Sequence, residues 1–396
     1  MQEQAIDPKD LVVERDGCFW VHTRAYSDPE IFELEMQKIF HRSWVYVGHE
    51  SEIPEGGDYK TTFIGRHPVI LARSSDDGTV NVFFNRCRHR GATVCQQEYG
   101  NANYFRCAYH GWVYNNKGDL MGVPFPEGYG EDFDQGKLGL VKVPRVDSYR
   151  GFIFASLSAE GPSLDEHLGN ARQYIDQFAA LGGEGIDIRG GIYRHTYKGN
   201  WKLQLENTVD SYHFGSIHQS IVELLTQHGR NVGSSVNRTG TVDLGNGQGM
   251  LDFSGLGYGG GGVSNSAPFN LVLLPNVALL SVQIRVVRPI AVDLTEVSLH
   301  FVRPKGLSRE AQAALAREHE YFYGPGSFGG PDDIEVAMER VQRGMQAPAV
   351  EWRILNRGLA AQTVDEKGII SDKFAVLSEV AERAIYRGWR EMLAQS

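Results

Sequence analysis

The feature that most constrains this chain is NRCRHRGATVCQQEYGNANYFRCAYHGW, residues 85–112, which holds three of the four cysteines and two histidines. Its metal-binding residue types are spaced as Cys87-x-His89, then 17 residues, then Cys107-x-x-His110. Each half therefore offers one thiolate and one imidazole. Such a stretch can hold a zinc ion, close a disulfide or carry an iron-sulfur cluster, and the three must be distinguished by spacing and context.

A disulfide is the least favoured of the three, because four cysteines in 396 residues do not make a disulfide framework. The N-terminal stretch MQEQAIDPKDLVVERDG has no basic region followed by an apolar run, and no window of about 18 apolar residues occurs in the sequence. We therefore expect a cytoplasmic protein that does not enter a membrane. In a reducing compartment, cysteines bind metal or remain thiols.

A structural zinc ion stays open as an interpretation, because zinc accepts two cysteines together with two histidines. Zinc fingers, however, place paired cysteines before paired histidines, whereas each loop here carries one of each. A two-iron, two-sulfur centre of the Rieske kind binds one iron through two cysteines and the other through two histidines. The spacing favours such a cluster, with the ligands Cys87, His89, Cys107 and His110. Cys18 and Cys95 match no ligand position and are expected to be ordinary thiols.

The pattern of elements divides the chain into three parts. Residues 1–40 form an N-terminal segment that we expect to pack on the C-terminal domain, with a helix that is capped by Asp28 and has Pro29 in its first turn. Residues 41–157 show short β-branched and aromatic runs broken by turn residues, including DDG at 76–78, which predicts a hairpin in an all-β domain. Residues 158–396 form the remaining domain.

The second domain mixes helices and strands out of strict alternation, so the predicted fold class is α+β: an N-terminal all-β domain and a C-terminal domain with an antiparallel sheet flanked by helices. Two long strands are expected within 276–304, and helices within 163–181, 200–227, 308–323 and 332–345. The glycine-rich stretch 245–268 is expected to be a loop, since its GLGYGG lacks the strand and helix that flank a dinucleotide fingerprint.

A second group of metal-binding residue types lies in NWKLQLENTVDSYHFGSIH, residues 200–218, and comprises Glu206, Asn207, Asp210, His213 and His218. On a continuous helix, Glu206, Asp210 and His213 would share one face, while the two histidines would stand about 140° apart. A helix end or distortion near Gly215 would bring the histidines together. Two histidines and one carboxylate form the facial triad of non-haem iron(II), with the carboxylate either local or distant.

Both groups resemble one family. RCRHRGA and RCAYHGW are similar to the Rieske pattern of bacterial aromatic-ring-hydroxylating oxygenases, and the stretch 200–218 resembles the pattern of their large (alpha) subunits. The resemblance implies that His213 and His218 bind a mononuclear iron with a carboxylate from a helix nearer the C-terminus. Asp333 in GPDDIEVAMERVQRG matches that ligand, with Asp332 as the alternative, although either aspartate could instead cap the helix.

The resemblance also assigns roles around the iron. It implies that Asp210 accepts hydrogen bonds from His213 and from His110 of a neighbouring subunit, and that Asn207 and Tyr212 lie near the iron. Trp201 and Lys202 are expected to be structural.

The implied activity is that of a terminal oxygenase component, which hydroxylates an aromatic ring with O2. One [2Fe-2S] cluster and one iron(II) are expected in each subunit, and no NAD or flavin. A separate reductase, with or without a ferredoxin, would supply electrons from NAD(P)H, and the family resemblance implies a small beta subunit and a trimeric arrangement, α3β3 or α3. A Rieske electron-transfer protein and a zinc-stabilised binding protein are the alternatives from other classes.

Substrate type is indicated less directly. With 39 basic and 49 acidic residues, the chain has a net charge of -10, so nucleic acid is not an expected partner.

The family resemblance also bears on the substrate. The benzoate, anthranilate and terephthalate branch of the family is resembled more than the naphthalene branch by PDDIEVAMERVQRGM and EWRILNRGL, and an aromatic carboxylate would bind a cation. Strand alternation in VQIRVVRP puts Arg285 and Arg288 on opposite faces. We favour Arg285 as the carboxylate partner because it matches a pocket-side position in the terephthalate-type pattern; a surface arginine is the alternative.

Overall fold

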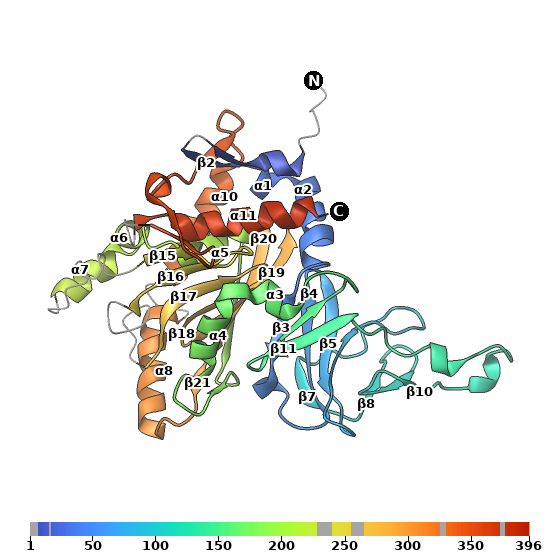
Figure 1. The fold of residues 1–396 in the computed structure, drawn as a ribbon. Coiled ribbons are helices and arrows are strands. Elements are labelled where there is room, and N and C mark those ends of the chain that lie inside the picture. The colour runs from blue at the N-terminus through green and yellow to red at the C-terminus, as the bar shows by residue number, and fades with distance from the viewer. Residues whose placement is uncertain are drawn as a thin grey trace. The chain divides into compact units, whose positions relative to one another are not determined.

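The computed structural model describes residues 7–15, 17–227, 240–254, 265–324, 330–372 and 377–395. The chain forms two compact units (Figure 1): Met1–Ile39 joins Asp165–Ser396 in the first, and Phe40–Leu164 is the second. None of the helices in the described part of the chain is both long and apolar enough to cross a membrane. The combination of a small β unit and a mixed unit confirms the predicted α+β class.

The unit Phe40–Leu164 is built from three antiparallel sheets, with strand orders β6-β5-β4-β7, β10-β9-β8 and β11-β12-β3. The strands are β3 Val45–His49, β4 Asp58–Ile64, β5 His67–Arg73, β6 Val80–Phe84, β7 Tyr99–Asn101, β8 Tyr104–Arg106, β9 Val113–Asn115, β10 Leu120–Gly122, β11 Arg145–Tyr149 and β12 Phe152–Ser156. The predicted DDG turn lies between β5 and β6, where Gly78 takes the left-handed φ of +72° that the reversal requires. This hairpin prediction is confirmed.

The other unit is centred on a nine-stranded antiparallel sheet of order β14-β20-β19-β18-β17-β16-β15-β24-β23. Its strands are β14 Ile192–Tyr197, β15 Gly240–Asp243, β16 Gly249–Asp252, β17 Ala267–Leu273, β18 Val277–Ser281, β19 Gln283–Ala291, β20 Leu294–Phe301, β23 Thr363–Val364 and β24 Ile370–Ser371. In the same unit, β1 Val12–Arg15, β2 Cys18–His22 and β22 Trp352–Ile354 form a separate three-stranded sheet that joins the N-terminal segment to a distant part of the chain.

Two strand expectations are wrong. The segment 276–304 contains β18, β19, β20 and the short strand β21, Arg303–Pro304, rather than two long strands, because the chain already reverses between the paired residues Leu280 and Gln283, with Ser281 at a φ of +53°. The glycine-rich stretch 245–268 is not a loop throughout, since it contains β16 and the start of β17. Its GLGYGG segment lies outside the described residues.

Helices pack against the large sheet. The C-terminal helix α11, Val380–Ala394, contacts β15, β16 and helix α5, Lys202–Val209, which itself contacts β16, β17 and β18 (Figure 1). Helix α4, Arg172–Ala179, packs on β17. Helices from separate parts of the chain therefore cover the strands β15 to β18.

Three helix predictions hold. Helix α2, Pro29–Glu35, begins where expected, because the Asp28 side chain accepts a hydrogen bond from the backbone N–H of Glu30. Helix α8, Arg309–Tyr323, begins after Ser308, whose hydroxyl accepts from the N–H of Ala311. The helical segment before Gly182 is present as α3, Leu164–Leu168, and α4, joined by a short 3-10 turn.

A buried carboxylate joins α2, α5 and α11. Glu35 is inaccessible to solvent and contacts Lys202, whose Nζ lies 2.5 Å from Oε1. The indole N–H groups of Trp201 and Trp389 donate to the same carboxylate at 2.8 and 2.7 Å. Trp201 and Lys202 are thus both part of the core, in agreement with the structural role expected for them.

Replacing Lys202 by Met should lower the melting temperature by on the order of 10 °C, since breaking a buried ion pair by removing one partner costs about 3–5 kcal/mol. The Glu35 charge would remain buried with only the two indole donors. Lys305→Met, at an exposed position of the same unit, is the control and should shift the melting temperature by less than about 2 °C. Thermal unfolding followed by circular dichroism measures both melting temperatures. Equal decreases in the two variants would contradict this account of the core.

Candidate active site

The two loops of the Cys/His stretch share one backbone pattern. In each, the cysteine N–H donates to the carbonyl five residues later, and the glycine four residues after the cysteine donates back to the cysteine carbonyl. The bonds are Cys87 to Ala92 at 2.8 Å, Gly91 to Cys87 at 3.0 Å, Cys107 to Trp112 at 2.8 Å and Gly111 to Cys107 at 2.9 Å. Both glycines have left-handed φ values, +80° and +71°, which explains why each loop needs glycine at that position.

The two loops bury their cysteines and bring their histidines together. Cys87 and Cys107 are buried, at 3% and 2% exposure, whereas His89 and His110 are partly exposed with ring centroids 4.5 Å apart. His89 stacks on Trp112 at 5.1 Å, and its buried Nδ1 has no hydrogen-bond partner among the described residues. Buried thiols beside a pair of outer imidazoles fit a cluster that uses two cysteines on one iron and two histidines on the other.

The remaining cysteines are not part of this group. All four cysteines are free thiols, so the disulfide interpretation is excluded. Cys95 packs in the hydrophobic core of the unit with Tyr59 and Phe105, and burial raises its pKa to about 12, so it stays protonated. Cys18 lies in β2 of the other unit. Both behave as the ordinary thiols that were expected.

The predicted helix over 200–227 is interrupted, which changes the geometry of the second group. Helix α5 ends at Val209, and Asp210 has the extended dihedral angles φ -88° and ψ 119°. A single helical turn follows as α6, Phe214–Ile217, and then α7, Gln219–Gln227. The expectation that Glu206, Asp210 and His213 share one helix face is therefore wrong. The break comes at Asp210 and not at Gly215, which lies inside α6.

This interruption places the two histidines together, because His213 precedes α6 and His218 follows it. Their ring centroids are 5.3 Å apart. The Nε2 atoms of His213 and His218 lie 3.6 and 3.2 Å from the same oxygen, Oδ1 of Asp333. Ligand atoms that each lie about 2.1 Å from one metal ion are separated by roughly 3.0–3.6 Å, so these spacings suit a shared ion.

Two further observations indicate that His213, His218 and Asp333 could bind a cation. One ligand atom from each of His213, His218 and Asp333 lies within 4.8 Å of the other two. Asp333 Oδ1 is buried and has no hydrogen-bond donor among the residues that the structure describes. A buried carboxylate oxygen without a donor, facing two imidazoles, is unfavourable unless a cation lies between them. Two histidines and one carboxylate are the ligands of the facial triad of non-haem iron.

Asp210 supports His213 from the far side of the imidazole. Its Oδ2 lies 3.2 Å from His213 Nδ1, while Oδ1 accepts from the backbone N–H groups of Tyr212 and His213 at 2.7 and 3.3 Å. Burial opposes the charge on Asp210, but these contacts outweigh it and lower its pKa. Burial likewise opposes the charge on His213, and the carboxylates of Asp210 and Asp333 outweigh it and raise its pKa. The carboxylate thus fixes the imidazole so that Nε2 faces Asp333.

The neighbouring aspartates at 332 and 333 differ in position. Asp333 begins the π-helix η10, Asp333–Arg340, and is buried, whereas Asp332 is the partly exposed residue before it. The side chain of Asp332 makes no capping hydrogen bond. Asp333 lies with the two histidines, and Asp332 is not part of that group. π-Helical turns are often found at functional sites.

Glu206 is not part of the triad. It is buried with Tyr26, Tyr386 and Arg353, whose Nη2 lies 2.8 Å from Oε2. Burial raises the pKa of Glu206 to about 8, against the opposing effects of Tyr386 and Lys202. The ring of Tyr212 is exposed and lies 3.8 Å from the guanidinium of Arg357. The expected place of Tyr212 near the iron stays a prediction.

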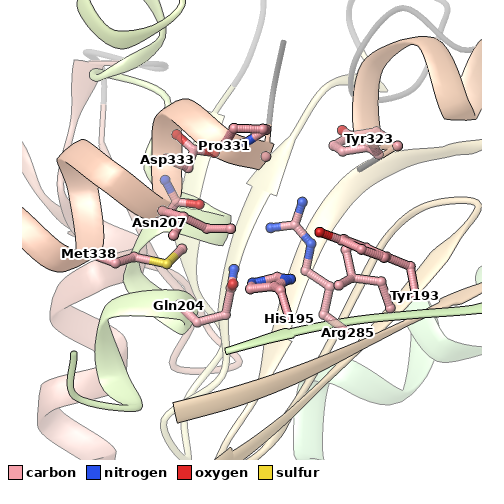
Figure 2. Close-up of a pocket in the computed structure, with 13 residues that line it drawn as sticks. Tyr193, His195, Gln204, Asn207, Arg285, Tyr323, Pro331, Asp333 and Met338 are labelled. Carbon is pink, nitrogen blue, oxygen red and sulfur yellow. The ribbon is translucent and has the colours of Figure 1, made fainter. Parts of the chain in front are cut away.

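A pocket lies beside Asp333 of the triad, and its empty volume of about 410 Å³ includes open solvent. Figure 2 shows Asp333 and Asn207 on one side of it, Arg285, Tyr193 and Tyr323 on the other, and His195 and Gln204 between them. The apolar side chains in its lining are Leu299, Pro331, Ile334 and Met338. The buried Nδ2 of Asn207 has no hydrogen-bond partner among the described residues.

The sheet supplies one wall of the pocket. Arg285 on β19 pairs with Leu299 on β20, and Leu299 pairs with Tyr193 on β14, so these three side chains point to the same face. His195 follows two residues later on β14 and shares that face. Arg288 lies on the opposite face, 3.3 Å from Glu296. The predicted separation of the two arginines is confirmed.

Arg285 is oriented by a short chain of hydrogen bonds. Its Nε donates to Oε1 of Gln283 at 2.8 Å, and the Gln283 amide nitrogen lies 3.1 Å from Nε2 of His319 on α8. The guanidinium also lies 5.6 Å from the Tyr323 ring centroid. In the part of the chain that is described, Arg285 forms no ion pair with a carboxylate, although it is only 8% exposed. Its terminal amino groups are thus directed at the pocket.

Several residues had not been singled out from the sequence, namely the pocket residues Tyr193, His195, Gln204 and Tyr323, and His319, which contacts Gln283. Only the strand IYRHTY carried a usable signal, since Tyr193, His195 and Tyr197 alternate along it and all three are aromatic. The others come from two different helices, and nothing in their local sequence relates them to Arg285.

Comparisons with known proteins identify two domains in the chain. Residues 43–145 match the Rieske [2Fe-2S] domain, and residues 186–395 match the ring hydroxylating alpha subunit catalytic domain. Toluate 1,2-dioxygenase subunit alpha of Pseudomonas putida is 34% identical over 83% of this chain and 81% of the relative. The anthranilate 1,2-dioxygenase large subunit of Acinetobacter baylyi is 34% identical over 87% and 81%.

A solved structure extends the similarity to the whole chain. Naphthalene 1,2-dioxygenase with indole bound in its active site superposes with a TM-score of 0.87 at 27% identity, over 99% of this chain and 96% of that one. The chain therefore belongs to the ring-hydroxylating oxygenase alpha subunits, with a Rieske domain followed by the catalytic domain of that family.

Proposed function

We propose that this chain is the terminal oxygenase component that hydroxylates an aromatic carboxylate with dioxygen. The observation that carries the proposal is one pocket lined on one side by Asp333, which lies with His213 and His218, and on the other by the buried cation Arg285. The names of three relatives add support, since they are dioxygenase subunits for toluate, 2-halobenzoate and anthranilate, which are aromatic carboxylates.

The two matched domains imply a Rieske cluster and a mononuclear iron. We assign one of each to a chain: Cys87 and Cys107 to one cluster iron, His89 and His110 to the other, and His213, His218 and Asp333 to the mononuclear iron. When bound, the cluster supplies electrons one at a time, and the iron(II) activates dioxygen at its open positions. The protein's part is to hold the ligands, orient the substrate and limit the access of water.

Asp210 is the residue we propose to join the two centres. Its contact with His213 supports a positioning role, and its side chain keeps 30% exposure, so it remains available to a second donor. The proposed donor is His110 of the partner subunit. This arrangement requires an oligomer, for which we propose a trimer, α3 or α3β3 with a small beta subunit. A separate reductase, with or without a ferredoxin, would deliver electrons from NAD(P)H.

The pocket supplies the features that an aromatic acid needs. The guanidinium of Arg285 would bind the carboxylate through charge-assisted hydrogen bonds, while Leu299, Ile334 and Met338 would contact the ring. The carboxylate at Arg285 leaves the ring directed toward the triad. Asn207, on α5 at the triad end, has an amide donor available to hold a polar atom near the reacting carbon.

A Rieske protein limited to electron transfer is not favoured, because it would need neither the triad nor the pocket. A zinc-stabilised protein is disfavoured by the Rieske domain match.

The ligand assignment is tested by replacing each neighbouring aspartate. Asp333→Asn should lower bound iron from about three to about two atoms per chain and leave two labile sulfides, because only the mononuclear site loses a charged ligand. Asp332→Asn is the matched control and should keep about three. Metal analysis with a sulfide assay measures both quantities. Loss of iron in Asp332→Asn but not in Asp333→Asn would show that Asp332, and not Asp333, is the iron ligand.

The carboxylate assignment is tested by Arg285→Met, which should weaken benzoate binding by roughly 10- to 100-fold, the value of a hydrogen bond to a charged group. Arg288→Met, on the opposite face of the same strand, should bind benzoate as the unmodified protein does. Calorimetric titration of the iron-loaded proteins measures both. Unchanged affinity in Arg285→Met would exclude the proposed carboxylate contact.

A further inference from the structure

His195 is a polar group in the pocket for which the proposed reaction has no use. Both ring nitrogens are buried, and neither has a hydrogen-bond partner among the residues that the structure describes. Its neighbours along β14 are aromatic, with ring centroids of Tyr193 and Tyr197 at 5.7 and 6.5 Å. A buried imidazole without a partner carries a desolvation cost unless a ligand satisfies it.

The imidazole is neutral at physiological pH. Burial and the nearby positive charge of Arg285 lower the pKa of His195 to about 4. A neutral imidazole has one N–H donor and one nitrogen acceptor. It therefore suits a neutral polar group that can donate or accept, such as a hydroxyl or an amino group.

The position of His195 relative to Arg285 limits where that group can be. Both side chains rise from the same face of the sheet, and Figure 2 shows the His195 ring beside the Arg285 side chain. A carboxylate held by the guanidinium would place the adjacent ring position nearest to the imidazole. The para position would point away from both, toward the triad end of the pocket.

We propose that His195 is a specificity residue that hydrogen-bonds a substituent next to the carboxylate. The preferred substrate class is then a benzoate with an N–H or O–H group at the ortho position. This inference rests on the proposed function, because the carboxylate at Arg285 fixes the position of the ring.

The test compares four acids of similar size on the iron-loaded protein: benzoate, 2-methylbenzoate, 2-hydroxybenzoate and 2-aminobenzoate. The methyl group fills the ortho position without a hydrogen bond. At least one of the two polar acids should bind on the order of tenfold more tightly than 2-methylbenzoate, the value of one hydrogen bond. In His195→Phe that ratio should fall to about one, with the affinity for 2-methylbenzoate retained.

Two further variants separate this role from a general effect on the pocket. Thr196→Val, at the next and exposed position of β14, should keep the full preference. His195→Gln retains a donor and an acceptor and should keep part of it. Each variant is judged by the ratio of its affinity for the polar acid to its affinity for 2-methylbenzoate. A variant that weakens the binding of all acids equally leaves this ratio unchanged.

Equal affinities for 2-methylbenzoate and both polar acids in the unmodified protein would overturn the inference. A His195→Phe variant that weakens all four acids equally would also overturn it, and would assign His195 to the carboxylate. Both of these outcomes leave binding of aromatic acids dependent on Arg285. A failure of the proposed function differs, since none of the four acids would then bind.

Discussion

The end of helix α5 at Val209 is the constraint on which the candidate active site depends. Because Asp210 leaves the helix with an extended backbone, the chain can form the single turn of α6 with one histidine at each end. The Asp210 carboxylate accepts a hydrogen bond from the backbone N–H of Tyr212, just before that turn, and lies beside Nδ1 of His213. A continuous helix would direct the two histidines about 140° apart.

The rest of the catalytic unit supports this arrangement through buried polar contacts. Glu35 ties α5 to α2 and α11, so the helix that carries Asn207 is fixed against the sheet. Across the pocket, Gln283 and His319 orient Arg285. Such groups are costly to bury without partners, and within the described residues the polar atoms left without protein partners include those of His195, Asn207 and Asp333, all in the pocket lining. The satisfied groups stabilise the fold, while these three remain available to a metal or a ligand.

Local patterns in the sequence predicted local structure well. Cys-x-His and Cys-x-x-His with a following glycine indicated the two loops, and Asp28 and the DDG turn indicated element boundaries, because each depends on hydrogen bonds between residues close in sequence. The break at Asp210 carries no Gly or Pro and was missed. The reversal at Ser281 was missed because serine is an uncommon residue at a left-handed φ. The partners of Arg285 could not be predicted, since strand register and helix packing bring them together from three separate segments.

The central claim is that this chain holds both the electron carrier and the site of oxygenation, and a single turnover tests it most directly. The iron-loaded protein is reduced in the absence of reductase, mixed with an aromatic carboxylate and exposed to ¹⁸O2 while the cluster spectrum is recorded. The account predicts that cluster oxidation accompanies a hydroxylated product labelled with ¹⁸O, and that His213→Ala retains the cluster spectrum but forms no product. Cluster oxidation without labelled product in the unmodified protein, across a panel of aromatic carboxylates, would contradict it.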